Sequence, residues 1–335
     1  MKRLIVAVAA ALLAAPSGEA VAQPAVPGLN AEAARSLADF LNAGPHRAFV
    51  VGADGRAAWW AGVSGADPGT AVNNALRRCE ERGKTPCTLH FVNNYTVNGA
   101  ASWREQVPER APDAPDIGRV RPEPYWSMRG PRLANGLIVW SHGYMAGRNA
   151  TDSAPQTWIG RFTRAGYDLY RFDREWIADW ASDATALAIA VRKAREMGYR
   201  RIVLAGQSAG GWVSLAALAR GAPVDGVIAV AAAHHGEVAK MRDTTRARSE
   251  WQNVLQALKP GPRVVVVNFA ADTYDVGGRM ADARSILAKS GVDGVIIDEP
   301  EGFKGHGAGS NPMFGRKFGS CMFAFVETGK KQPPC

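Results

Sequence analysis

The most informative stretch of this sequence lies at residues 204–211, which read LAGQSAGG. Ser208 stands in a Gly-x-Ser-x-Gly pattern, which is typical of a sharp strand-to-helix turn that exposes a nucleophilic serine. The two glycines are needed because a side chain at either position would collide with the neighbouring strand or helix. The flanks agree with this turn, since the apolar run Arg201–Ala205 predicts a strand and Ala209–Arg220 predicts a helix.

Strands and helices are predicted to alternate on both sides of this turn. The apolar runs Leu137–Ser141, Tyr167–Phe172 and Arg263–Phe269 predict strands, and the amphipathic segment Asp183–Met197 predicts a helix. Continuous apolar strands between helices indicate a mostly parallel sheet with helices on both faces. The same alternation includes Thr157–Ala165, Val227–Ala232, Ser249–Leu258, Ala281–Ser290, Gly294–Ile297 and Phe314–Val326.

Residues 29–100 predict a small N-terminal α+β module. Its expected elements are a helix at Leu29–Asn42, a hairpin at Ala48–Val51 and Ala57–Ala61, a helix at Thr70–Arg82 and a strand at Leu89–Val92. This unit resembles the small ββαβ, cysteine-paired modules of secreted bacterial proteins, and it brings no catalytic motif. The proline-containing segment 101–115 predicts a linker, and residues 116–335 then form the second domain.

The first 22 residues have the layout of a secretory signal peptide. Lys2 and Arg3 precede an apolar run at Leu4–Ala15, and Ala20 and Ala22 supply small residues at the expected cleavage site. The apolar run is shorter than the roughly 20 residues that a bilayer span requires, and no later run approaches that length. We therefore expect an exported protein, periplasmic or extracellular, without a membrane span.

The four cysteines predict disulfides if the chain is exported. Among the three connectivities that four cysteines allow, the local pairs Cys79–Cys87 and Cys321–Cys335 are the simplest. Free thiols remain an alternative for the C-terminal pair. No cysteine or histidine spacing is that of a metal site, and no phosphate-binding or dinucleotide-binding motif occurs, so the sequence predicts neither metal nor cofactor.

The chain carries a formal net charge of +9, spread along its length. Arginines cluster at Arg77–Arg82 and Arg242–Arg248, without interleaved aromatic residues or a nucleic-acid motif. Solvated helix faces explain these clusters, so we expect no nucleic-acid partner. Weak association with an anionic cell envelope is the remaining expectation from charge.

A nucleophilic serine needs a general base, and the base needs an acid that orients it. Two of the six histidines lie in the N-terminal module. The other four follow predicted strands of the second domain: His142, His234, His235 and His306.

With these residues, the region from about 116 to 328 resembles the α/β-hydrolases. Ser208 matches the nucleophile of that family, and His306, in a glycine-rich loop after the last strand, matches its base. The family order of serine, acid and histidine implies an acid between them. Asp272 is the expected residue, because it is nearest the end of its strand, and Asp275 is the substitute.

The resemblance also implies an oxyanion hole and a pocket. The N–H groups of Ala209 and Tyr144 are the expected oxyanion donors, since His142-Gly143 matches the His-Gly segment after the third family strand. Gln207, His142, His234 and His235 are candidate pocket residues, with His142 expected to be structural or to support the oxyanion hole.

These observations predict a serine hydrolase that cleaves carboxylic esters through an acyl-enzyme. Only about 15 residues separate the predicted strand Val227–Ala232 from the predicted helix Ser249–Leu258, so any lid over the site is small. A small lid suits short-chain or polymer-bound esters. Two alternatives stay open. One is a peptidase or amidase that uses the same residues, and the other is a non-catalytic envelope-binding protein with a hydrolase fold.

Overall fold

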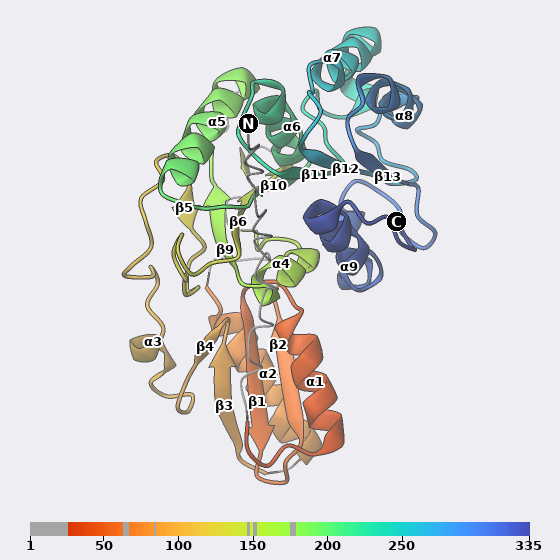
Figure 1. The fold of residues 1–335 in the computed structure, drawn as a ribbon. Helices are drawn as coiled ribbons and strands as arrows, with labels where there is room; N and C mark the ends of the chain where they lie inside the picture. The colour runs from red at the N-terminus through yellow and green to blue at the C-terminus, as the bar shows by residue number, and fades with distance from the viewer. Residues whose placement is uncertain (1–25, 63–66, 84, 146–147, 150–152, 175–178) are drawn as a thin grey trace, which may run out of the picture.

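The computed structural model describes residues 26–62, 67–83, 85–145, 148–149, 153–174 and 179–335 (Figure 1). The predicted signal peptide, residues 1–22, lies outside these ranges. Within them, no helix combines the length and the apolar character that crossing a membrane requires.

A seven-stranded sheet forms the centre of the larger part of the molecule. Its order is β13-β12-β11-β10-β6-β9-β5, and only the edge strand β5 runs antiparallel to its neighbour. The predicted mostly parallel sheet is therefore confirmed. The strands are β5 (Arg121–Pro122), β6 (Gly136–Ser141), β9 (Tyr167–Phe172), β10 (Ile202–Gln207), β11 (Gly226–Val230), β12 (Arg263–Asn268) and β13 (Gly294–Asp298).

Both faces of this sheet are buried because most side chains of its central strands are apolar and pack alternately into two hydrophobic clusters. In β6, Leu137 and Val139 pack into one hydrophobic cluster, and Ile138 and Trp140 pack into the cluster on the opposite face. Figure 1 shows α5 (Trp180–Glu196), α6 (Ala209–Ala219), α7 (Thr244–Gln256) and α8 (Arg279–Ser290) on the first face, with α4 (Gly160–Arg164) and α9 (Pro312–Thr328) on the second.

The strand order reverses beside β6. The chain passes from β6 outward to β9, and then returns to place β10 on the other side of β6. Ligands of open α/β sheets bind beyond the carboxyl ends of the strands at such a reversal. Ser208 follows β10 and His142 follows β6, so both residues stand at this point.

The N-terminal part contains a second, antiparallel sheet in the order β2-β1-β3-β4, as expected for a ββαβ-like module. The disulfide Cys79–Cys87 joins α2 to β3, as predicted. Its elements are α1 (Ala31–Leu41), β1 (Arg47–Gly52), β2 (Ala57–Ala61), α2 (Gly69–Gly83), β3 (Cys87–Val92) and β4 (Tyr95–Thr96).

The segment between the two sheets packs against the small module. It contains the short helix α3 (Trp103–Gln106), and the Trp103 ring is buried in one of the module's hydrophobic clusters. The linker at 101–115 and the boundaries on either side of it remain predictions.

A buried chain of polar groups connects the module to the large sheet. Nε2 of His46 lies 2.9 Å from one carboxylate oxygen of Glu123, and the Arg171 guanidinium lies 3.4 Å from the other. These side chains are at most 1% exposed, so the Glu123 carboxylate is compensated by the Arg171 guanidinium rather than by water. At the other end of the chain, Cys321 of α9 is bonded to Cys335, which is the predicted C-terminal pair.

Candidate active site

Ser208 occupies the strained turn that its sequence motif predicts. Its φ of +56° and ψ of −124° lie outside the conformations that non-glycine residues prefer. A Cβ on Gly206 would overlap the backbone of Gly210, and a Cβ on Gly210 would overlap the carbonyl group of Ser141. The turn therefore packs backbone against backbone, which only glycine permits at these two positions.

Three side chains predicted from the sequence meet at this turn. Nε2 of His306 lies 2.8 Å from Oγ of Ser208, and Nδ1 of the same ring lies 2.9 and 3.0 Å from the two carboxylate oxygens of Asp272. Ser208 is 6% exposed, and the side chains of Asp272 and His306 are 3% and 17% exposed. The serine is thus within hydrogen-bond reach of a base whose other nitrogen faces a buried acid.

Asp272, and not Asp275, lies against the imidazole. Oδ1 of Asp272 also accepts a hydrogen bond of 2.8 Å from the N–H of Tyr274, which fixes the carboxylate within its own loop. Oδ1 of Asp275 instead accepts from the N–H of Gly277 at 3.0 Å. The substitute acid therefore closes a turn three residues farther along the chain.

The loops that carry the base and the acid are tied to each other. The N–H of Gly305 donates to the carbonyl of Ala270 at 2.8 Å, beside a bridge between Ala270 and Lys304. Nε2 of Gln207 donates to the carbonyl of His306 at 3.1 Å. Gln207, a candidate pocket residue that directly precedes Ser208, thus ties the loop of His306 to the turn of the serine.

Tyr274 is a site residue that the sequence does not signal. Its ring stacks on the His306 imidazole, with centroids 4.0 Å apart and planes inclined by 29°. Its hydroxyl donates to Glu237 at 3.5 Å, and burial together with this carboxylate raises the pKa of Tyr274. The ring restricts the imidazole to one plane, which keeps Nε2 directed at Ser208.

The candidate oxyanion donors flank Ser208. Ala209 is the first residue of α6, where a helix N–H has no partner inside the helix. A Cβ on Gly143 would lie 3.3 Å from the Cβ of Ser208, so the segment after β6 runs directly beside the serine. Tyr144, which follows in β7 (Tyr144–Met145), is opposite Asn149 of β8 (Arg148–Asn149), and its role as a donor stays a prediction.

His142 is buried beneath this segment. Nε2 accepts a hydrogen bond from the N–H of Arg174 at 3.2 Å, which leaves Nδ1 protonated and donating to the carbonyl of Gly143 at 2.7 Å. Burial, and then the charge of Arg174, lower the pKa of His142 to about 4, so the ring is neutral at pH 7. The ring lies against the backbone beside Ser208, and its structural role stays a prediction.

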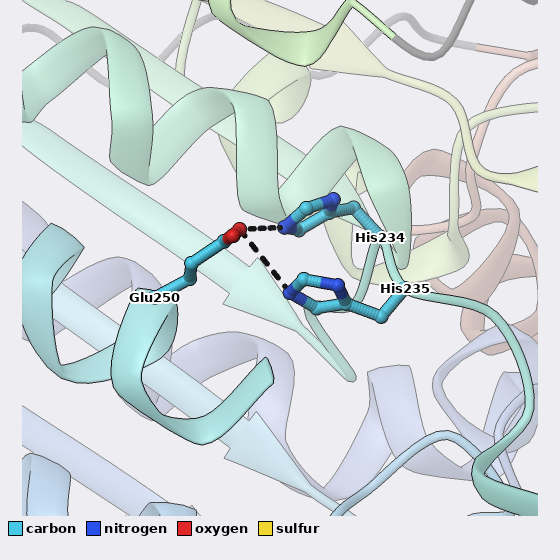
Figure 2. A group of neighbouring side chains, drawn as sticks. All are labelled: His234, His235 and Glu250. Carbon is cyan, nitrogen blue, oxygen red and sulfur yellow. Dashed lines mark ion pairs between the residues drawn. The ribbon is translucent and has the colours of Figure 1, made fainter. Parts of the chain in front are cut away.

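His234 and His235 line a cavity of about 490 Å³ that also includes Ala209. The backbone N–H of Ala233 donates to the carbonyl of Ser208 at 3.1 Å. His234 is the next residue after Ala233, so the histidine pair lies close to the serine. Both rings turn toward Glu250 of α7 (Figure 2). Burial, followed by the neighbouring His235, lowers the pKa of His234 to about 3.

Comparison with protein-family models gives no match, and comparison with curated proteins gives none. Solved structures give distant matches. A truncated carbohydrate esterase from gut microbiota is 15% identical, with 66% of this chain and 96% of that chain covered and a TM-score of 0.45. An esterase from Pyrobaculum calidifontis is 17% identical, with 63% and 80% covered and a TM-score of 0.42. An acylaminoacyl peptidase from Pyrococcus horikoshii is 11% identical, with 75% and 48% covered and a TM-score of 0.48.

At these identities and TM-scores, the matches carry no argument about activity, and this chain spans about half of the peptidase it resembles. The fold follows from the strand order with its antiparallel edge strand, and from the strained serine between β10 and α6. The chain has the α/β-hydrolase fold, preceded by a small antiparallel module.

Proposed function

We propose that this chain is an exported serine hydrolase that cleaves carboxylic esters through an acyl-enzyme intermediate. The observation that carries the proposal is the continuous contact from Ser208 Oγ through the His306 imidazole to the buried carboxylate of Asp272. A helix-capping serine does not require a histidine at 2.8 Å with an acid behind it. Export is supported by the signal-peptide pattern and by the two disulfides.

In the proposed reaction, Ser208 Oγ attacks the ester carbonyl carbon while His306 Nε2 accepts its proton. Asp272 holds the proton on Nδ1 and stabilises the charged ring. The Ala209 N–H stabilises the oxyanion, a contribution that is typically about 3 kcal/mol per donor. His306 then gives its proton to the departing alcohol, and a water, activated by the same ring, releases the acid and restores Ser208.

The cavity beside Ala209 favours a compact, polar substrate. Most of its lining residues are charged, and a long alkyl chain would displace water from these charged groups at a cost in free energy. The charged lining residues are Arg174, Asp183, Lys240, Arg242, Asp243, Arg246 and Glu250. Short-chain or polymer-bound esters fit this chemistry better than lipids.

The test is hydrolysis of p-nitrophenyl esters of increasing chain length, beside a matching set of anilides, by disulfide-intact protein. We expect turnover of the short esters and its loss in Ser208→Ala. Ser214→Ala is the matched control, because this serine is buried on the same helix and donates only to the carbonyl of Gly210. Faster turnover of the anilides would replace the esterase with an amidase or peptidase. Turnover of neither set, in folded protein, would contradict the proposal.

A further inference from the structure

His234 and His235, which line the cavity that includes Ala209, form with Glu250 a cluster that the proposed reaction does not use. Nε2 of His234 and Nε2 of His235 lie 3.2 and 3.4 Å from the same oxygen, Oε2 of Glu250. Figure 2 shows the two rings side by side, with one nitrogen of each turned toward this carboxylate. The three ligand atoms all lie within 4.8 Å of one another.

The Nε2 atoms of His234 and His235 make no hydrogen bond within the described residues. The two Nε2 atoms are buried, and neither has an acceptor or donor in suitable geometry anywhere in the described chain, in spite of their short distances to Glu250. A buried polar atom without a partner costs about 1–3 kcal/mol, and here two such atoms point at one place. A group that both nitrogens and the carboxylate bind together would satisfy all three.

The two distances from Oε2 of Glu250 to the histidine nitrogens are those expected between zinc ligands. Zinc bonds of about 2.0–2.1 Å to nitrogen and about 2.0–2.2 Å to oxygen, at the tetrahedral angle, place the ligand atoms about 3.3–3.5 Å apart. The observed distances to Oε2 are 3.2 and 3.4 Å. Two imidazoles and one carboxylate are a donor set that suits zinc, whereas magnesium and calcium prefer oxygen alone.

The surroundings hold these three side chains in place. Arg246 Nε donates to the other carboxylate oxygen, Oε1, at 2.8 Å, which orients Glu250 and leaves Oε2 directed at the histidines. The Trp212 ring packs on His234 with centroids 4.2 Å apart. Because Trp212 lies on the helix that begins after Ser208, the cluster is rigidly joined to the candidate active site.

We propose that His234, His235 and Glu250 bind a zinc-type divalent cation, with a fourth coordination position open to the cavity that includes Ala209. In that position the ion would bind a water or an anionic oxygen of the substrate. This second role rests on the proposed function, but the metal site itself does not.

The experiment uses tag-free, disulfide-intact protein that has been freed of metal with EDTA and dialysed. Zinc chloride is titrated by calorimetry, and bound cobalt is examined by its visible spectrum, which distinguishes four-coordinate from six-coordinate ions. We expect one equivalent of zinc, a four-coordinate cobalt spectrum, and no binding of magnesium. His235→Gln and Glu250→Gln should each weaken zinc binding by at least about 100-fold, since each removes a direct ligand.

His90→Gln is the matched control and should bind zinc as the original protein does, because His90 lies on β3 of the small module. Absence of zinc binding by the original protein would overturn the proposal, and so would undiminished binding by either ligand variant. If a variant fails to fold, the cobalt spectrum and a zinc-dependent rise in Tm of the original protein decide the question. Esterase activity is not needed for any of these readouts.

Discussion

Replacing Asp272 with Asn removes the negative charge behind the candidate base while keeping its shape. The carboxylate contacts His306 Nδ1 through both oxygens, at 2.9 and 3.0 Å, and its side chain is 3% exposed, so little water replaces it. An asparagine favours the wrong imidazole tautomer and no longer stabilises the charged ring. This loss is worth about 10⁴ in rate, which is about 5.5 kcal/mol at 1.36 kcal/mol per factor of ten.

The fold should tolerate this substitution, since an asparagine oxygen still accepts the hydrogen bond from the Tyr274 N–H. We expect the free energy of unfolding, measured in urea, to change by no more than about 1 kcal/mol. The assay is the second-order rate of labelling by a fluorophosphonate, which reports serine activation without a choice of substrate. Asp275→Asn is the matched control and should label at the original rate. A large loss in Asp275→Asn with none in Asp272→Asn would refute the assignment of the acid.

Three further outcomes follow from the structure. Gly210→Ala should abolish labelling and destabilise the protein by more than about 1–3 kcal/mol, because its Cβ would overlap the Ser141 carbonyl. Gly307→Ala is the control and should leave the free energy of unfolding in urea unchanged, because open space surrounds this position. Replacing Cys79 and Cys87 together with Ala should cost roughly 2–3 kcal/mol in the unfolding of the small module, by the entropy of a short closed loop, and should leave the labelling rate unchanged. His142 has a folded-state pKa of about 4, below its unfolded value of about 6.5, so the protein loses stability as the pH falls from about 6.5 toward 4. The free energy of unfolding in urea should therefore fall between pH 7.5 and pH 5, and His142→Gln should remove about 2 kcal/mol of that fall.

The large sheet could be predicted from the sequence because its buried strands are apolar on both faces. The strand predicted at Leu137–Ser141 is observed at Gly136–Ser141, and the helix predicted at Ala281–Ser290 is observed at Arg279–Ser290. The edge strand β5 (Arg121–Pro122) was not predicted. Two residues are too few to show a period, and its proline is tolerated only because it lies at an edge.

The candidate site likewise contains residues that the sequence predicts and residues that it does not. Ser208 and His306 were predictable because each sits in a glycine-rich turn after a strand, and such turns have a sequence pattern. Asp272 was preferred over Asp275 because it lies nearest the strand end, and the path of the loop brings Asp272, and not Asp275, against the imidazole. Tyr274 and the partnership of His234 with Glu250 were not predictable, since no motif marks a ring that stacks on a base or a carboxylate that faces a histidine from another helix.

The most direct test of the account is to locate the fluorophosphonate adduct by peptide mass spectrometry in the disulfide-intact protein. We expect one adduct per chain, on Ser208, and none in His306→Ala, because the serine is activated only through its 2.8 Å contact with that imidazole. An adduct on another residue, or labelling of Ser208 that persists at the original rate in His306→Ala, would contradict it.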